Sequence, residues 1–371
     1  MISVINFNKS YLFQDLLNKT DSAKKYRPCL TIGHNSKEFP KDFTNYCAQN
    51  YIQDLRKAGE CHKKVRYELQ NYIKPGMRVL DICNFVENTV VKNFGENSLK
   101  QGIGFPIGYS INNIIAHDTA HVNDTRVLDK DDVVKIDYGT HVNGHIIDSA
   151  FTLAYNPKYM PLLEATKEAT WNAIKMIGPD TYMNDISKEI SETINSYEIE
   201  LNNNLQKIKP VNYLGGHNIK PYVIHGGDLI LCSPSNNPTV QQMRIKTNTS
   251  YAIETFATTG NSSYNIDENN NNLYSLKIIN KNNNIKFKTD IAQKVFNYIK
   301  TTHGSLPFCS RWLYNKFGNN YKIAINELIK NDIINTYPPI SDIKTSYSSQ
   351  LEHTIYVHDY GKEILSHFYD Y

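Results

Sequence analysis

Two acidic residues, Asp137 and Asp148, stand on either side of the most distinctive turn in this sequence. Asn143-Gly144 joins two apolar runs in VVKIDYGTHVNGHIIDSAFTLAY, a pattern typical of a two-residue β-hairpin. Side chains alternate along a strand with period two, so this turn places both aspartates on one face, as diagonal neighbours with Cβ atoms roughly 7 Å apart. The predicted register pairs Val142 with His145, Asp137 with Ala150, and Gly139 with Asp148.

Two carboxylates that point at one spot of an apolar hairpin repel each other unless something positive lies between them. A shared proton, an Arg or Lys side chain, or a metal ion meets that requirement. Alternatively, one aspartate faces solvent and the other caps the turn. The hairpin alone does not decide between these interpretations.

Two further acids, Glu254 in YAIETFA and Glu352 in QLEHTIYV, lie in apolar, strand-like settings. Glutamate is depleted in strands and is almost never buried without a partner, although a single one is usually at an edge or faces solvent. Together with the aspartate pair they carry four negative charges, which two divalent cations neutralise. Carboxylates mixed with imidazole favour Mn²⁺, Fe²⁺, Co²⁺ or Zn²⁺ over Ca²⁺.

Three histidines stand where an imidazole could serve such a site. His217 follows Gly215-Gly216, where the backbone can approach closely, His225 lies in YVIHGG, and His117 ends INNIIAH. A lone histidine is usually an ordinary core or surface residue. We therefore interpret five other histidines as ordinary core or surface residues, namely His121, His141, His145, His303 and His367.

The composition is that of a globular protein, and its nearly balanced charge does not indicate binding to nucleic acid. The chain has 371 residues and a formal charge of +3. Its six cysteines are scattered without a C-x-x-C pair, so reduced thiols are expected. The first residues predict no secretory signal, and no apolar run approaches the roughly 20 residues of a membrane span.

The elements that must position these residues form two similar series. In the first series, helices are expected at 43–72 and 81–94, followed by a strand starting at Gly102, a strand at 111–117 and the hairpin. In the second series, helices are expected at 158–177 and 184–197, followed by strands at 220–225, 229–232 and 250–257. This repeated order is weak evidence for a duplication. The asparagine-rich stretch 261–284 is expected as a loose loop or hairpin tip, followed by short helices at 290–300, 310–316 and 324–331, and a last strand at 346–358.

Five motifs in this order, GFPIGYSINNIIAH, KIDYGTHVNGHIIDSAFT, GGHNIKPYVIHGG, YAIETF and QLEHTI, resemble those of the type 2 methionine aminopeptidases. The resemblance runs from about residue 48 to the C-terminus. It implies an α+β "pita-bread" (creatinase/aminopeptidase) fold, in which a pseudo-two-fold, curved antiparallel sheet is flanked by helices. It further implies a surface extension at 1–44, a catalytic domain at 45–371, and a type 2 helical insert at about 272–336.

The resemblance also implies an activity, a metal site and partners. Such enzymes remove the initiator methionine from nascent proteins whose second residue is small, using a metal-bridged hydroxide. They are expected to be cytoplasmic monomers that act on nascent polypeptide N-termini, and a transient ribosome contact is left open. By position, two divalent metal ions would be held by Asp137, Asp148, His217, Glu254 and Glu352.

Further roles follow by position. Glu254 would shuttle the proton of the attacking water, and His117 and His225 would hydrogen-bond the peptide and the tetrahedral intermediate. The counterpart of His117 is the group that fumagillin-type epoxides alkylate. The pocket for the methionine side chain would be lined by Phe105, Ile224 and Tyr337.

The sequence also departs from the family pattern. Gly215 replaces the usual asparagine, no histidine is apparent in the run 269–272, and the residues after His117 lack Pro-Asn. The long charged extension of many type 2 enzymes has no counterpart, so ribosome contact through such an arm is not expected.

Two other functions compete with methionine removal. One is an X-Pro aminopeptidase or prolidase on the same fold, which would carry a large extra N-terminal domain. The other is a metal-free, non-catalytic relative that binds ribosome or RNA; such a protein loses the ligands, whereas all five are present, and it needs a clustered basic face.

Overall fold

The computed structural model describes residues 30–33, 50–278, 286–359 and 361–368. Its first half consists of two helices and a three-stranded antiparallel sheet of order β2-β4-β5. The bounds of these elements are α3 Asn50–Tyr72, α4 Val79–Phe94, β2 Gln101–Ile111, β4 Val133–Val142 and β5 His145–Ala154.

The second half repeats this plan with a larger sheet. Its strands run in the order β1-β18-β17-β11-β9-β10, with β8 paired to β11. The bounds are α5 Met160–Met176, α6 Met183–Asn195, β1 Leu30–Gly33, β8 Lys209–Pro210, β9 Gly215–Ile219, β10 Leu229–Leu231, β11 Thr249–Thr258, β17 Ser348–His358 and β18 Gly361–Ile364. The two-fold order of helices and strands expected from the sequence is therefore present, and the α+β pita-bread class is confirmed.

Side-chain hydroxyls join the two sheets where β5 runs beside β17. Thr354 Oγ1 accepts a hydrogen bond from the Asp148 amide (2.7 Å) and donates to the Asp148 carbonyl (2.6 Å). Ser149 Oγ donates to the Glu352 carbonyl, and Thr152 Oγ1 donates to the Gln350 carbonyl. These bonds satisfy backbone groups at the junction and hold the two halves in a fixed relative position.

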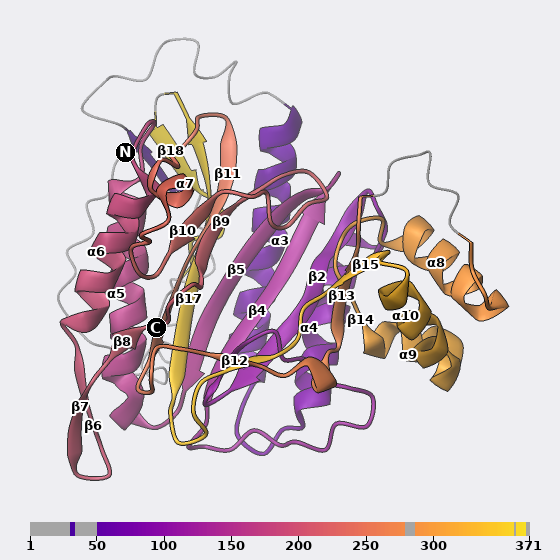
Figure 1. Cartoon of the computed structure of the whole chain (residues 1–371), viewed down its shortest axis with the longest axis horizontal. Coiled ribbons are helices and arrows are strands. Elements are labelled where there is room, and N and C mark those ends of the chain that lie inside the picture. Colours follow the sequence, from indigo (N-terminus) through magenta and orange to yellow (C-terminus); the bar gives the residue numbers. More distant parts are fainter. Residues whose placement is uncertain (1–29, 34–49, 279–285, 360, 369–371) are drawn as a thin grey trace.

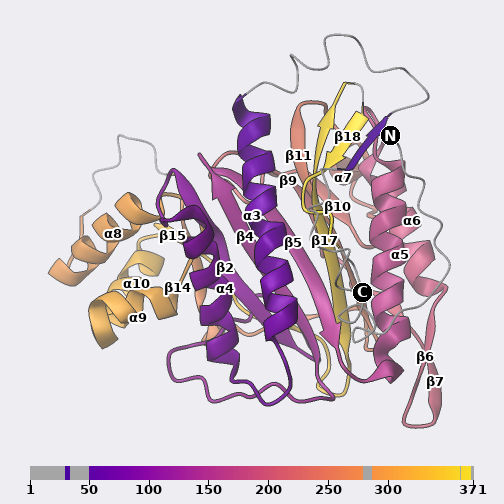
Figure 2. The ribbon, with the colours of Figure 1, turned by 180° about the vertical axis from the view of Figure 1, so that it is seen from behind.

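The helices cover one face of the curved sheets and leave the other face for a site (Figures 1 and 2). Helices α3 and α4 pack on β2, β4 and β5, and α5 packs on β11 and β17. Residues four apart on α4, namely Ile82, Val86 and Val90, form its buried stripe, as helical periodicity requires. Gly95, with φ +77°, ends this helix by donating its amide to the Val91 carbonyl.

The described elements from β13 to β15, which lie in the sequence between β11 and β17, form a small lobe at one side of the molecule (Figure 1). Its sheet has the order β14-β13-β15, and its own apolar core includes Phe308, Leu313 and Leu328. A buried ion pair of Arg311 with Glu87 of α4 anchors the lobe to the first half. The elements are β13 Leu273–Leu276, α8 Asp290–Thr302, β14 Phe308–Cys309, α9 Ser310–Phe317, α10 Tyr321–Lys330 and β15 Ile334–Thr336.

Several shorter elements lie between those already described, besides the 3₁₀ helices η1 Pro157–Tyr159, η2 Glu268–Asn270 and η3 Gly318–Asn320. They are β3 Ile114–Ala116, β6 Glu198–Leu201, β7 Asn204–Lys207, α7 Pro238–Gln241, β12 Asn265–Ile266 and β16 Ile340–Ser341. None of the described helices is both long enough and apolar enough to cross a bilayer.

The structure corrects three expectations about local structure. The expected strand at 220–225 is wrong, because Lys220 and Val223 close a tight turn and the strand instead occupies Gly215–Ile219. The strand expected at 111–117 is interrupted by a turn in which Asn112 has φ +53°. The asparagine-rich stretch contains β12 and β13 rather than only loop, with 279–285 outside the described residues. The start of the helix expected at 43–72 also lies partly outside them.

Candidate metal centre

The β4–β5 hairpin has the register that its turn predicts. Val142 pairs with His145, Asp137 with Ala150, and Gly139 with Asp148. Both carboxylates therefore point to the open face of the sheet. The turn is closely packed: Gly144 has φ +78°, and a Cβ at this position would lie 2.3 Å from the Tyr222 ring.

The second half contributes its two glutamates from neighbouring strands. In the β11–β17 pair, Glu254 lies directly opposite Glu352, so their side chains leave the sheet on the same face. Because β17 also runs beside β5, this pair meets the aspartates of the hairpin.

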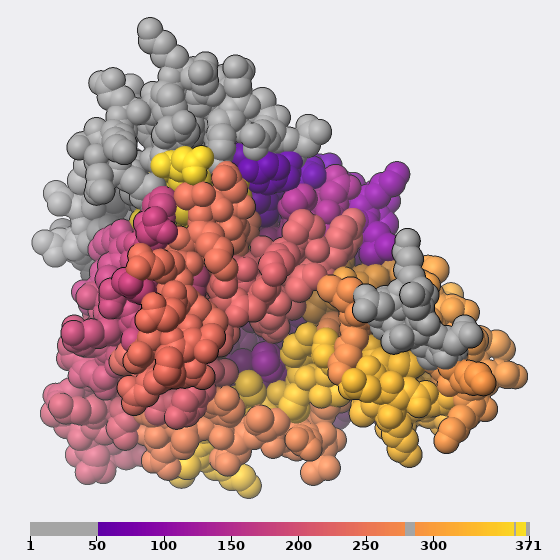
Figure 3. Space-filling view, turned by 45° about the horizontal axis from the view of Figure 1, so that its top comes forward, coloured from indigo at the N-terminus to yellow at the C-terminus, as the bar shows by residue number. Residues whose placement is uncertain are grey.

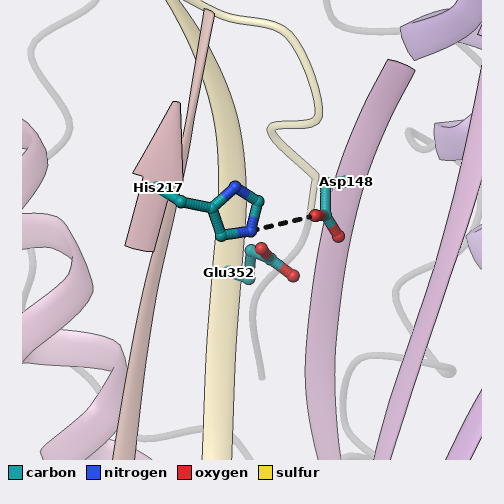
Figure 4. Close-up of side chains that lie close together, drawn as sticks. All are labelled: Asp148, His217 and Glu352. Atoms are coloured by element: carbon teal, nitrogen blue, oxygen red, sulfur yellow. Dashed lines mark ion pairs between the residues drawn. The ribbon is translucent and has the colours of Figure 1, made fainter. Parts of the chain in front are cut away.

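His217 reaches the same point from β9, where it is paired with Ala252 of β11. The preceding Gly216 allows this approach, because a Cβ there would lie 2.3 Å from the Ala252 carbonyl oxygen. The imidazole Nδ1 donates to the Asn218 carbonyl (3.3 Å), which leaves the Nε2 lone pair facing the acids. Figure 4 shows Asp148, His217 and Glu352 converging from three strands.

The contacting atoms of this cluster lie close together. His217 Nε2 is 3.6 Å from Asp148 Oδ2 and 4.0 Å from Glu254 Oε1. Among the described residues, ligand atoms of Asp148, His217 and Glu352 all lie within 4.8 Å of one another. Gln350 Nε2 donates to Glu254 Oε2 (3.1 Å) and lies 3.4 Å from Asp137 Oδ2, and so links the remaining two acids.

The carboxylates of the cluster repel one another, and a cation would relieve this repulsion. Burial raises the pKa of Asp137 to about 7, and burial together with neighbouring carboxylates raises the pKa of Asp148, Glu254 and Glu352 well above normal. Burial, with His225 nearby, lowers the pKa of His217 well below its usual value. The neutral imidazole of His217 then carries no positive charge that could offset the repulsion among the carboxylates.

Two buried carboxylate oxygens, Asp137 Oδ1 and Glu352 Oε2, also lack a hydrogen-bond partner within the described part of the chain. Unsatisfied buried acceptors are costly, and here they face the same point as the His217 lone pair. Carboxylate oxygens and an imidazole nitrogen are the donor set of transition-metal sites. The residues present therefore fit a divalent metal ion.

All ten residues predicted for the site line one cavity of about 280 Å³. Figure 3 shows a hollow near the centre of the molecule, where purple atoms of the first half are visible between later segments. The structure brings together the ten residues, which are Phe105, His117, Asp137, Asp148, His217, Ile224, His225, Glu254, Tyr337 and Glu352.

The two remaining histidines flank the metal cluster. The ring centroids of His225 and His217 are 4.5 Å apart, and Tyr337 lies 5.8 Å from His225 and 5.9 Å from His117. Burial lowers the pKa of His117 to about 4, with His225 adding to the effect. His225 is exposed to the cavity, yet the protein around it still lowers the pKa of its imidazole. Both rings are therefore neutral near pH 7.

Sequence reasoning missed several residues of the cavity. Gln350 had a detectable signal, since it is two residues before Glu352 and so shares its face of β17. Gly139 does not itself line the cavity, but it supports Phe105, whose ring would lie 2.3 Å from a Cβ added at Gly139, and the sequence gave no signal of this contact. Leu273 and Pro307 line the cavity from the small lobe, which only the tertiary structure brings near.

Comparisons with known proteins agree with this geometry. The model of "Metallopeptidase family M24" matches residues 53–359. Methionine aminopeptidase 2 of Debaryomyces hansenii is 42% identical over 327 residues, which cover 87% of this chain and 75% of that protein. The methionine aminopeptidase 2 of Schizosaccharomyces pombe is 39% identical over 325 residues, with the same two coverages of 87% and 75%.

Solved structures of lower identity share the fold. A thermophilic Arx1 superposes with a TM-score of 0.74 at 16% identity, covering 86% of this chain and 91% of that one. Methionine aminopeptidase from Thermotoga maritima gives a TM-score of 0.57 at 17% identity, covering 86% and 98%. Since the relatives at about 40% identity are methionine aminopeptidases 2, the X-Pro and non-catalytic alternatives are not favoured. The chain belongs to metallopeptidase family M24 and, within it, to the methionine aminopeptidase 2 enzymes, hydrolases that remove an N-terminal methionine.

Proposed function

We propose that two divalent cations, drawn from Mn²⁺, Fe²⁺, Co²⁺ and Zn²⁺, are held by Asp137, Asp148, His217, Glu254 and Glu352. The observation that carries this proposal is the convergence of four carboxylates and a neutral imidazole on one point. Two of the carboxylates are buried and two are half-buried, and two carboxylate oxygens have no hydrogen-bond partner among the described residues. In this proposal Asp148 and Glu352, which adjoin across the junction of the two halves, would serve as ligands to both ions.

When bound, such cations act as Lewis acids and lower the pKa of water, so that a strong nucleophile exists near neutral pH. The protein's own residues have distinct tasks around this centre. Glu254 accepts the proton of the attacking water and passes it to the departing amine. The free amine of the substrate would be anchored at the same centre, which would restrict cleavage to the first peptide bond.

His117 and His225 are assigned to the peptide rather than to the metal. Both rings are neutral near pH 7, so each can donate one hydrogen bond, to the scissile carbonyl oxygen or to the peptide backbone. His117 also has an unfavourable backbone conformation, with φ +65°, which orients its ring into the cavity. A neutral, accessible imidazole here is the proposed target of fumagillin-type epoxides.

The methionine side chain is assigned to the end of the cavity formed by Phe105, Ile224 and Tyr337. Phe105 lies on Gly139, and Ile224 packs in a cluster with Leu306, so the walls of this pocket are fixed by surrounding packing. Tyr337 is held by hydrogen bonds from its amide to the Leu273 carbonyl and between its hydroxyl and Ser275. An apolar slot of this kind selects an unbranched, apolar side chain by size.

The wider assignments follow from the same reasoning. We assign residues 45–371 to the catalytic domain, with the segment at about 272–336 as its helical insert and 1–44 as an extension. Nascent polypeptide N-termini in the cytoplasm are the proposed substrates of a monomeric enzyme.

Release of methionine from Met-Ala-Ser tests the proposal, with Ala-Pro-Ser as the competing X-Pro substrate. The purified chain is treated with a chelator and then titrated with Mn²⁺ or Co²⁺. Restored cleavage of Met-Ala-Ser alone supports methionine removal, whereas faster cleavage of Ala-Pro-Ser supports the X-Pro activity. The Asp332→Asn variant is a matched control, because that carboxylate is 85% exposed and does not line the cavity.

A further inference from the structure

The cavity at the metal centre is lined by buried residues, here called its closed end, and by exposed residues, here called its open end. Leu273, Pro307 and Ile224 are buried at the closed end. At the open end, Tyr213 is 76% exposed and Leu229 is 39% exposed. An aminopeptidase encloses the first residue of its substrate, so the rest of the peptide leaves through the open end.

Tyr213 is unusual in two respects. Its φ of +64° is a left-handed conformation that bulky residues rarely adopt, and its ring leaves a large apolar surface in water. Tyr222 has a similar φ of +61°, but its ring packs on Gly144 and its hydroxyl donates to the Leu99 carbonyl. Internal packing explains Tyr222 and does not explain the exposed Tyr213.

Hydrogen bonds on both sides hold the Tyr213 turn in place. The amide of Asn212 donates to the Ser262 carbonyl (2.8 Å), and its side-chain oxygen accepts from Ser233 Oγ (2.8 Å). On the other side, the Leu214 carbonyl accepts from the Cys232 amide (2.8 Å). The backbone on both sides of Tyr213 is therefore held in place by the surrounding structure.

The position of Tyr213 matches the path of a substrate. His217 lies at the metal centre, and Tyr213 precedes it by four residues at the approach to β9. An extended peptide advances roughly 3.3 Å per residue, so a chain leaving the centre along this segment passes Tyr213 about three to four residues after the cleaved bond. An aromatic face makes a rigid, sequence-tolerant contact at that distance.

We propose that Tyr213 is a substrate-binding residue whose ring stacks on the peptide backbone beyond the second residue, so that the enzyme binds longer N-termini more tightly than dipeptides. This inference rests on the proposed function, since it requires methionine to occupy the closed end. The contact is made equally in the ground state and in the transition state, so it lowers KM and leaves kcat unchanged.

The test compares Met-Ala amide with Met-Ala-Ser-Ala-Ser-Ala, using the full chain loaded with Mn²⁺. For the hexapeptide, Tyr213→Ala is expected to raise KM by about 3- to 10-fold. For Met-Ala amide, KM is expected to stay within about twofold of the original value, and kcat is expected to be unchanged for both substrates. Tyr213→Phe keeps the ring and is expected to retain the tight KM. Leu205→Ala is a matched control, since Leu205 is 69% exposed on the distant β6–β7 hairpin.

Equal KM changes for both substrates, or no change for either, overturn the proposal. Tyr213→Gly separates binding from folding, because glycine accepts the positive φ and the melting temperature is expected not to fall. If the unmodified enzyme releases no methionine from either substrate, the proposed function itself fails, and that outcome is distinct from a failure of the Tyr213 contact.

Discussion

The two halves of the molecule bring their acids to the metal centre in different ways. In the first half, a two-residue turn sets the register of β4 and β5 and thereby places Asp137 and Asp148 on one face. In the second half, Glu254 and Glu352 come from strands separated in sequence by the whole small lobe, and their pairing depends on the long β11–β17 register. One pair is positioned by local turn chemistry and the other by tertiary packing.

This difference explains which parts could be predicted from the sequence. The hairpin register followed from Asn143-Gly144 alone, because period two and turn type determine which residues face each other. The pairing of Glu254 with Glu352 could be inferred only through a family resemblance, since no local pattern sets the register of distant strands.

The misplaced strand near His217 has a similar cause. The sequence KPYVIH has the β-branched and aromatic residues typical of strands, whereas Gly215-Gly216 lacks them. In the structure the glycines form β9, because only their small size permits contact with the Ala252 carbonyl, and KPYV forms a turn. Tertiary packing therefore outweighed the β-strand propensity of the sequence. This happened next to His217, a predicted metal ligand that must approach a neighbouring strand.

The largest expected effect comes from single substitutions of the two acids that are proposed to serve both ions, Asp148 in the first half and Glu352 in the second. Asp148→Asn and Glu352→Gln should each lower the rate of methionine release by about 10³-fold or more, because each removes a charge that holds the cations. Metal content measured by elemental analysis should fall in parallel, whereas Asp332→Asn should behave as the unmodified enzyme. Full metal content in Glu352→Gln contradicts its assigned role.

A smaller effect is expected at Gln350, which links the hairpin acid Asp137 to Glu254 of the other half. Gln350→Met removes this bridge while keeping similar volume, and should weaken metal affinity by about 10- to 100-fold. Titration of the chelator-treated protein with Mn²⁺ measures the change. Unaltered affinity shows that the acids need no such link to keep their positions.

The hairpin turn can be tested by its stability. Gly144→Ala adds a Cβ to a residue with φ +78° and forces it against the Tyr222 ring, so unfolding free energy should fall by about 2–3 kcal/mol. Gly76→Ala is a matched control, because Gly76 has φ +92° but open space around its Cβ position, and should cost only about 1 kcal/mol. Urea denaturation measures both, and equal losses contradict the packing argument.

The smallest expected effect is on the pH dependence of the metal-free protein. Burial raises the pKa of Asp137 to about 7 and the pKa values of the other three acids of the cluster well above normal. Above pH 7 the folded metal-free protein therefore still binds more protons than the unfolded chain, and its stability falls as the pH rises. Above pH 7 the histidines with lowered pKa values are neutral in both states and do not oppose this trend. The melting temperature in chelator should fall by a few degrees from pH 7 to 8.5.

Bound Mn²⁺ should reverse this trend, because metal and protons compete for the same carboxylates. Asp137→Asn should reduce the fall in melting temperature that is measured in chelator, since the amide does not titrate and no longer repels the other three acids. A chelated protein that becomes more stable between pH 7 and 8.5 contradicts the assigned pKa shift.

Anomalous diffraction from crystals grown with Mn²⁺ tests the central claim most directly. Two anomalous peaks are expected among Asp137, Asp148, His217, Glu254 and Glu352, with Asp148 and Glu352 contacting both. A Mn²⁺-saturated crystal with no peak in this cavity, or with its peaks elsewhere, would contradict the claim that cations hold these five residues together.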